Sequence, residues 1–341
     1  EPYVPGEQPQ EKVVKLNTNE NPYPPAPGVQ AALDSLDPAD FRLYPDPTSG
    51  ELVRSLADYY GVGEDQVFVG VGSDDVLSLC FLTFFNSEKP VLFPDITYSF
   101  YKVWAELYRI PYECPALDGD FRIVKEDYYR ENGGIIFPNP NAPTAIYEEL
   151  DFIEDILEHN RDSIVIVDEA YVDFAGRSAM ELIGKYDNLI VTQTFSKARS
   201  MAGMRIGYAI SNPDLIRCLN DVKYSFNSYT MSRAALVCGA AAVEDRAYFE
   251  DSVRRIKETE NGQRKNSQSL DLSLRIQRQT SCSRAIPAMT AGSSSGNCGM
   301  RISMCATGTM RGSDSISGSP WARTKRWRSC LSSLRNGCPN R

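Results

Sequence analysis

Short apolar runs alternate with amphipathic segments along the first 258 residues of the chain. The apolar runs are bounded by turn residues, which predicts β-strands. These runs lie at 67–72, 90–94, 110–114, 134–138, 163–169, 189–195 and 207–211. The amphipathic segments have the period of helices, and they lie at 50–61, 74–86, 99–108, 149–160, 178–186, 213–224 and 232–258.

This alternation predicts a doubly wound α/β fold with a mostly parallel sheet. The run 163–169 is apolar on both faces, as expected of a strand in the middle of a sheet that helices cover on both sides. Ligands of such folds bind at the carboxyl ends of the strands. The motifs described below each follow a predicted strand, which indicates a site at that edge.

Composition narrows the class of protein. With 42% apolar and 24% charged residues, the chain is typical of globular proteins. Its longest apolar stretch, 76–85, is about half of a membrane span, and no signal segment is visible, so we expect a cytoplasmic protein without membrane contact.

The nine cysteines show no metal-type pairs and are interpreted as reduced thiols. The single histidine, His159, gives little basis for histidine catalysis or a zinc site, and we expect no metal.

The last 81 residues differ from the rest. Residues 1–260 contain 23 basic and 43 acidic residues, whereas residues 261–341 contain 13 and 2, and the tail lacks Val, Phe, Tyr, Glu and His. Strands and cores normally need such residues. A basic nucleic-acid arm and a disordered segment are alternatives. We favour translation in a shifted reading frame after about residue 258, which predicts no function and no nucleic-acid partner for the tail.

Two motifs directly follow predicted strands. G-V-G-S-D-D at 70–75 joins a strand to a helix that begins at Ser73 or Asp74, and free N–H groups there can bind an anion. A tight turn with a helix cap is the simpler alternative. V-D-E-A-Y at 167–171 ends a buried strand with Asp168, whose carboxylate needs a cationic partner such as a protonated pyridine nitrogen. Tyr171 could then reach the adjacent ring oxygen, although a strand-end Asp can also simply cap a turn.

The third motif is T-F-S-K-A-R-S-M-A-G-M-R-I-G-Y at 194–208. Lys197 directly follows an apolar strand, so its amine should lie at the mouth of the sheet, where it can form an imine. Ser196 and Arg205 could bind a phosphate, the arginine through a bidentate fork.

These motifs together resemble those of fold-type I aminotransferases, and the set is similar to the histidinol-phosphate aminotransferases. The matching segments run in order from residue 16 to residue 208: L-N-T-N-E-N-P-Y-P-P (16–25), F-R-L-Y-P-D-P (41–47), D-I-T-Y-S-F-Y (95–101), P-N-P-N-A-P-T (138–144), V-D-E-A-Y-V-D-F (167–174) and S-K-A-R-S-M-A-G-M-R-I-G-Y (196–208). The resemblance covers about residues 10–258.

The resemblance implies a pyridoxal 5'-phosphate cofactor and a role for each matched residue. Lys197 would carry the cofactor and move the proton, Asp168 would pair with the pyridinium nitrogen, and Tyr171 would hydrogen-bond the ring hydroxyl. Tyr98 would stack on the ring. The phosphate would be held by Ser73, Asp74, Ser196 and Arg205, and by Tyr44 from a neighbouring subunit, which implies a homodimer. Tyr23 would line the substrate side.

Two positions depart from the family pattern. The family usually has Asn before the P-T-G turn, where this chain has Ala142, and Asn141 could substitute; Ala145 stands in place of the glycine. The family's substrate-binding Arg comes from an L-R-I-S-type strand of the C-terminal domain. M-R-I-S at 300–303 offers Arg301, but its surroundings lack a strand pattern, and we interpret the match as chance.

The implied reaction is transamination between L-histidinol phosphate and 2-oxoglutarate. Alternatives are an aromatic amino-acid aminotransferase, a threonine-phosphate decarboxylase, and a product that binds the cofactor without turnover. We divide the chain into an arm with part of a small domain (1–45), a large cofactor-binding domain (46–245), the start of the small domain (246–260) and the anomalous tail (261–341).

Overall fold

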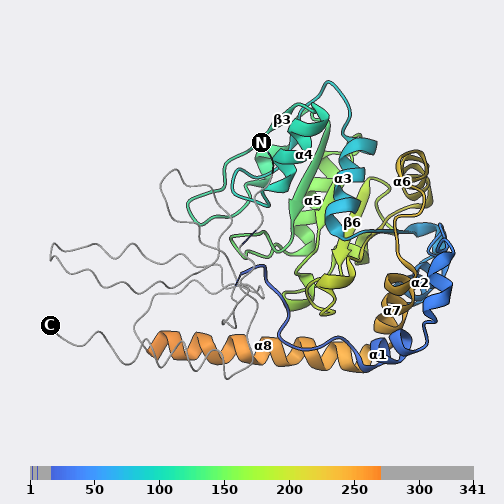
Figure 1. The fold of residues 1–341 in the computed structure, drawn as a ribbon. Helices are drawn as coiled ribbons and strands as arrows, with labels where there is room; N and C mark the ends of the chain where they lie inside the picture. Colours follow the sequence, from blue (N-terminus) through green and yellow to red (C-terminus); the bar gives the residue numbers. More distant parts are fainter. Residues whose placement is uncertain (1, 3–5, 7–16, 270–341) are drawn as a thin grey trace.

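A seven-stranded sheet forms the centre of the computed structural model, which describes residues 2, 6 and 17–269 (Figure 1). Its strands lie in the order β1-β7-β6-β5-β4-β2-β3. They are β1 (Val67–Gly70), β2 (Val91–Leu92), β3 (Tyr112–Glu113), β4 (Gly134–Pro138), β5 (Val165–Asp168), β6 (Leu189–Thr194) and β7 (Gly207–Ile210). Each lies within one of the predicted strands.

Only β7 runs against the other strands of this sheet, since it pairs antiparallel with both β1 and β6. The remaining neighbours pair in parallel. Asp168 pairs in register with Pro138 of β4 and with Thr192 of β6, so the carboxyl ends of the three central strands meet at one edge. The predicted doubly wound, mostly parallel fold is confirmed.

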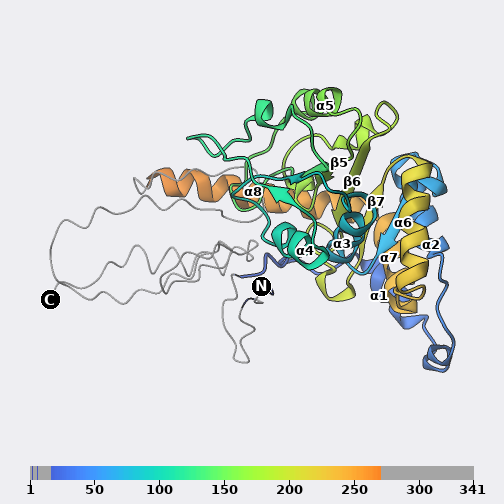
Figure 2. The same cartoon turned by 90° about the horizontal axis from the view of Figure 1, so that it is seen from above.

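Two layers of helices cover the sheet because its strands are apolar on both faces. Val165 and Val167 of β5 pack in one core cluster, and Ile166, between them, packs in the other. The first cluster includes α1 (Pro27–Asp34), α2 (Gly50–Tyr60), α5 (Leu150–His159) and α7 (Arg233–Glu244). The second includes α3 (Ser73–Phe84), α4 (Phe100–Tyr108) and α6 (Pro213–Phe226). Figure 2 shows α5 on one side of the sheet and α3 and α4 on the other.

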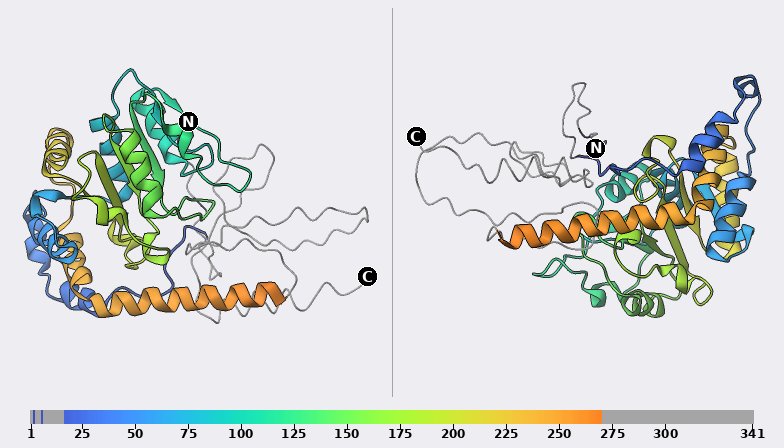
Figure 3. Two further views of the ribbon diagram at one scale, coloured as in Figure 1. Left: turned by 180° about the vertical axis from the view of Figure 1, so that it is seen from behind. Right: turned by 90° about the horizontal axis from the view of Figure 1, so that it is seen from below.

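The segment 232–258 was predicted as one helix, and this prediction is wrong. The structure has α7, then a break at Asp245, then α8 (Arg246–Ser269), which extends along the molecule as a long helix (Figures 1 and 3). Asp245 has ψ 67°, outside the helical range, and its carboxylate accepts a 3.1 Å hydrogen bond from the N–H of Tyr248. A side-chain cap of this kind begins a new helix.

Two further helix predictions need correction. The segment 178–186 contains only the 3₁₀ helix η5 (Ala179–Leu182), and α1 was not predicted, although Pro27 at its first position favours a helix start. Five more 3₁₀ helices are present: η1 (Pro38–Arg42), η2 (Glu64–Gln66), η3 (Lys125–Tyr128), η4 (Val172–Phe174) and η6 (Ala202–Met204).

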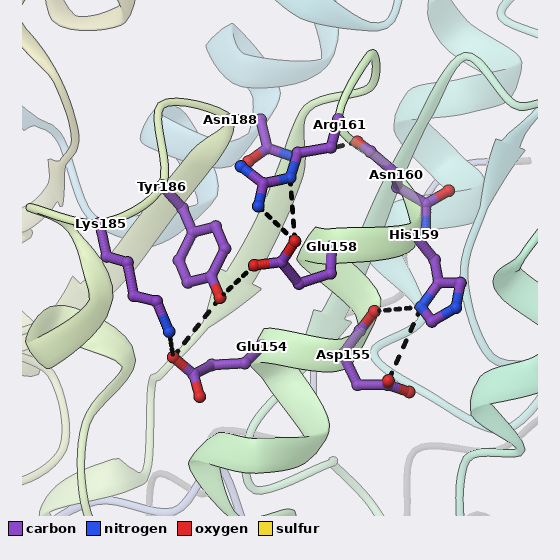
Figure 4. A network of polar contacts seen from close by, with 9 residues as sticks. All are labelled: Glu154, Asp155, Glu158, His159, Asn160, Arg161, Lys185, Tyr186 and Asn188. Atoms are coloured by element: carbon purple, nitrogen blue, oxygen red, sulfur yellow. Dashed lines mark hydrogen bonds and ion pairs between the residues drawn. The ribbon is translucent and has the colours of Figure 1, made fainter.

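His159 belongs to a surface network at the end of α5 (Figure 4). Its Nδ1 lies 2.8 Å from the carbonyl oxygen of Asp155, and its ring stacks on Tyr129. Nearby, Glu158 accepts hydrogen bonds from Tyr186 and Arg161. Because α5 leads into the amino end of β5, this network lies at the opposite edge of the sheet from Asp168.

Neither a membrane-spanning helix nor a metal-binding cluster is present within residues 17–269. No helix in this range is long and apolar enough to cross a membrane. No group of three or more His, Cys, Asp or Glu side chains in the same range is arranged to hold a metal ion.

Candidate active site

Asp168 ends β5 as a buried carboxyl group, 5% exposed. Its Oδ2 accepts a 2.8 Å hydrogen bond from the Tyr101 hydroxyl, and its Oδ1 lies 3.5 Å from Thr192 Oγ1. Burial raises the pKa of Asp168 to about 6, and the hydrogen bond from Tyr101 only partly opposes this rise. No Lys, Arg or His among the described residues forms an ion pair with this carboxyl group.

Two tyrosine side chains, Tyr98 and Tyr101, lie between Asp168 and the start of α3. The rings of Tyr98 and Tyr101 lie 5.7 Å apart, and the Tyr98 hydroxyl donates a 2.8 Å hydrogen bond to Asp74 Oδ1. Burial raises the pKa of the Tyr98 phenol well above its usual value, so Tyr98 stays a neutral donor. Asp74 and Asp168 are therefore connected through two tyrosines of one segment.

Lys197 follows β6 and meets the N-terminal segment of the chain. Its Nζ donates a 2.9 Å hydrogen bond to the carbonyl oxygen of Thr18 and lies 5.6 Å from the centre of the Tyr171 ring. The Tyr171 hydroxyl accepts a 2.6 Å hydrogen bond from Asn19 Nδ2. Asn21 Nδ2 donates to the backbone carbonyl of Lys197 at 2.9 Å. The amine, Tyr171 and the segment 18–21 thus form one side of the site.

The loop before α3 forms a cradle for an anion. The helix begins at Ser73 after Gly72 and has no side-chain cap, so the N–H groups of its first turn can bind a ligand. Gly72 has φ 87°, a left-handed conformation that favours glycine. A Cβ atom on Gly207 would lie 2.3 Å from the backbone N of Ser73, so only glycine lets β7 approach this loop. Arg205 lies over the same turn, 3.6 Å from Asp74 Oδ2.

The other predicted residues lie around this centre. Ser196 is buried beside Lys197, and Tyr23 packs in a cluster with Tyr171 and Ala198. Asn141 is buried in a neighbouring loop, where its amide donates to Ile96 and Thr144 and accepts from Thr97.

Tyr44 lies away from these residues, with its ring 4.6 Å from that of Tyr229 and 80% exposed. Ala145, in place of the usual glycine, has φ 63°. Arg301 lies outside the described residues.

Four contacting residues were not predicted: Asn19, Asn21, Tyr101 and Thr192. Asn19 and Asn21 belong to the N-T-N-E-N motif, and Tyr101 ends the D-I-T-Y-S-F-Y motif. The two motifs therefore included these three residues, but neither motif predicted a role for them. Thr192 pairs in register with Asp168, and strand pairing could have found it.

A buried carboxyl group, a lysine and an uncapped helix start at the carboxyl edge of a doubly wound sheet are the arrangement expected of an α/β enzyme with an anionic organic ligand. Comparison with known proteins identifies the family. A model of "Aminotransferase class I and II" matches residues 11–290. The chain belongs to this family.

Curated relatives cover most of the chain. A histidinol-phosphate aminotransferase of Pseudomonas putida is 55% identical over 256 residues, which are 75% of this chain and 74% of that protein. One from Clostridium beijerinckii is 49% identical over 272 residues, or 80% of this chain and 76% of the relative.

Solved structures share the fold. The crystal structure of histidinol-phosphate aminotransferase from Sinorhizobium meliloti in complex with pyridoxal-5'-phosphate has a TM-score of 0.71 at 22% identity, and it covers 78% of this chain and 74% of its own. A putative histidinol-phosphate aminotransferase from Erwinia carotovora atroseptica also gives a TM-score of 0.71, at 23% identity, over 78% of this chain and 79% of its own. These neighbours confirm the fold of the fold-type I aminotransferases.

The raised pKa of Asp168 predicts a pH-dependent loss of stability in the cofactor-free protein. The folded pKa of about 6 exceeds the ordinary value of 3.8, so the folded state holds a proton that the unfolded state has already released. Stability is therefore fully present below pH about 4 and falls as the pH rises through about 6. A shift of about two units corresponds to about 3 kcal/mol.

Asp168→Asn removes this titration while keeping the shape of the side chain. Urea unfolding between pH about 4 and about 7 should show a fall in the free energy of unfolding that is about 3 kcal/mol smaller than in the wild type. Asp214→Asn, at a side chain 79% exposed, is the matched control. Glu169, whose pKa burial raises to about 7, titrates in all three proteins, so each keeps some pH dependence. A pH dependence in Asp168→Asn equal to that of the wild type would contradict the raised pKa of Asp168.

Proposed function

We propose that the chain is a pyridoxal-phosphate-dependent aminotransferase that transfers an amino group between L-histidinol phosphate and 2-oxoglutarate. The products would be imidazole acetol phosphate and glutamate. The observation that carries this proposal is the 55% identity to the Pseudomonas putida histidinol-phosphate aminotransferase over 75% of the chain. The 49% identity to the relative from Clostridium beijerinckii supports the same reaction.

The residues of the site fit pyridoxal phosphate. The buried carboxyl group of Asp168 has only neutral hydrogen-bond donors among its side-chain partners, which suits a ring nitrogen that carries a proton. The uncapped start of α3, with Arg205 over Gly72, suits a phosphate. Beside Lys197, the side-chain oxygens of Thr18 and Asn19 are buried without a hydrogen-bond partner in the described part of the chain, so this corner offers polar atoms to a ligand.

Three side chains of the site would each have a separate role in the reaction. Pyridoxal phosphate, when bound, supplies an electron sink for negative charge that develops on the substrate carbon. Lys197 would hold the cofactor through its Nζ, and after release that amine would take up and return the proton at the substrate carbon. Asp168 would keep the ring nitrogen protonated, and Tyr171 would hydrogen-bond the ring hydroxyl.

Other residues would orient the cofactor. Tyr98 would stack on the ring, and its hydrogen bond to Asp74 fixes the tilt of the phenol. The backbone N–H groups of Ser73 and Asp74 would hold the phosphate together with the Ser196 hydroxyl and the Arg205 guanidinium. To contact the ring oxygen, Asn141 would have to break one of its hydrogen bonds in the structure, such as the one from its Nδ2 to Ile96 O.

A homodimer is part of the proposal. Tyr44 would reach the phosphate of a neighbouring subunit, and its exposed ring supports this role. Tyr44 and its ring neighbour Tyr229 belong to two segments that carry further exposed apolar side chains, which a second copy could cover. The exposed apolar residues of these segments are Phe41, Leu43, Tyr44, Phe226 and Tyr229, which are 46–80% exposed. Groups of exposed apolar side chains are typical of contact surfaces.

Sedimentation analysis tests the dimer. The wild-type chain should sediment at twice the monomer mass, and Phe226→Asp should shift it toward monomer and weaken cofactor binding, because a charge at the interface is costly to bury. Leu107→Asp, at a residue 67% exposed on α4, should leave the mass unchanged. A monomeric wild-type protein with bound cofactor would refute this part of the proposal.

Donor kinetics test the reaction. With 2-oxoglutarate as acceptor, kcat/KM should be highest for L-histidinol phosphate, well above L-phenylalanine, and L-threonine phosphate should not be decarboxylated. Preference for phenylalanine would favour the aromatic aminotransferase, and decarboxylation would favour the threonine-phosphate enzyme. Visible cofactor absorbance that responds to no amino donor would favour a protein that binds the cofactor without turnover.

Lys197→Ala is the matching variant. It should lose the visible absorbance of bound pyridoxal phosphate and all detectable turnover, because no other amine would hold the cofactor covalently. Lys102→Ala, at an exposed side chain on α4, should behave as wild type. If Lys197→Ala keeps the wild-type spectrum, Lys197 does not carry the cofactor.

The division of the chain is also a proposal. We propose that residues 46–245 form the large cofactor-binding domain, that residues 1–45 and 246–260 belong to the small domain, and that residues 261–341 are read in a shifted frame. The alignment with the Pseudomonas putida relative spans 256 of the 341 residues, which supports a limit to the family sequence within this chain, although the family model extends to residue 290. Resequencing the gene around codons 255–265 tests the frame.

A cytoplasmic location remains a proposal as well. It is supported by the free thiols of four described cysteines, Cys80, Cys114, Cys218 and Cys238, because disulfides are rare where thiols are kept reduced.

A further inference from the structure

Arg255 of α8 stacks on the ring of Tyr23. Its guanidinium carbon lies 4.2 Å from the ring centre, within the range of a cation–π contact. The two residues come from segments far apart in the sequence, the N-terminal segment and the long helix. The Arg255 side chain is 47% exposed, so solvent and solutes reach it.

Tyr23 connects this arginine to the lysine of the site. Its ring packs in a cluster with Tyr171 and Ala198, which directly follows Lys197. Its backbone N–H donates a 3.0 Å hydrogen bond to Asn21 Oδ1, and Asn21 Nδ2 in turn donates to the Lys197 carbonyl. A short chain of contacts therefore fixes the guanidinium relative to the Lys197 backbone.

The positive charge of Arg255 is weakly compensated. Its ion pair with Asp251 is long, 3.9 Å, and its guanidinium donates no hydrogen bond within the part of the chain that the structure describes. Asp251 is engaged mainly by Arg254, which also binds Glu258 at 2.6 Å. The N–H groups of a guanidinium lie in its own plane, so a guanidinium whose central carbon contacts a ring can still bind an oxyanion in bidentate fashion through its edge.

We propose that Arg255 is a specificity-determining residue that favours amino donors carrying a phosphate over the same donors without it. The guanidinium would bind the phosphate while the stacked Tyr23 ring fixes its position. This inference rests on the proposed function, since it assumes that the Tyr23 side of Lys197 receives the donor. Arg255 precedes residues 261–341 in the sequence, so the proposed role of this cation does not depend on that tail.

Binding of two matched donors tests the proposal. L-histidinol phosphate and L-histidinol would be titrated by calorimetry into protein whose cofactor has been fixed by borohydride reduction, so that neither donor is turned over. Arg255→Met should raise the Kd of L-histidinol phosphate about tenfold or more, because a charge-assisted hydrogen bond is lost, and change that of L-histidinol less than about twofold. In kinetics the same variant should raise KM more than it lowers kcat.

The neighbouring residue supplies the control. Arg254→Met removes the same charge one position away and should leave both Kd values at wild type, while Arg255→Lys should restore part of the preference for phosphate. Equal weakening of both donors by Arg255→Met, or no weakening of either, would overturn the proposal. If the wild-type chain holds no cofactor, the proposed function fails, and the two Kd values measured on the unloaded protein still test Arg255.

Discussion

The site depends on one buried carboxyl group, Asp168, which has no cationic partner within the part of the chain that the structure describes. Asp168 lies at the carboxyl end of a central strand, between β4 and β6, where helices on both faces of the sheet exclude water. Hydrogen bonds from Tyr101 and Thr192 relieve only part of the cost of burial, and its pKa rises to about 6. A cationic ring at this position would reverse that rise, because an opposite charge favours the ionised carboxylate. In the proposed function, the protonated ring of pyridoxal phosphate would relieve this cost of burial, and binding would be favoured for that reason.

Backbone geometry shapes the loop before α3, where we propose that the phosphate of the cofactor binds. The close approach of β7 to the loop before α3 requires glycine at position 207, and the left-handed turn at Gly72 directs the first N–H groups of α3 outward. Arg205 itself adopts φ 53°, which aims its side chain back over this turn. Since these elements are joined by the rigid sheet, the distance between the carboxyl group and the anion cradle is fixed by the fold. In the proposed function, such a site would favour ligands of one length.

Much of this arrangement could be predicted from the chain because the signals are local. Strand periodicity gave all seven strands, and the rule that ligands bind at carboxyl ends brought Asp168 and Lys197 to one edge. The break at Asp245 was missed because a single capping side chain outweighed a continuous apolar period. The contacts of Asn19 and Asn21 could not be derived, since they join residues more than 150 positions apart, and residues 17–26 contain no helix or strand. Long-range polar contacts of this kind leave no periodic trace in a sequence.

The protonation state of the ring nitrogen of bound pyridoxal phosphate tests directly whether Asp168 pairs with that nitrogen. Nuclear magnetic resonance of the protein loaded with pyridoxal phosphate carrying an isotope-labelled ring nitrogen reports whether that nitrogen holds a proton. We expect a protonated nitrogen across the neutral pH range in the wild type and an unprotonated one in Asp168→Asn. A nitrogen that is unprotonated in the wild type, or protonated equally in both proteins, would contradict this pairing.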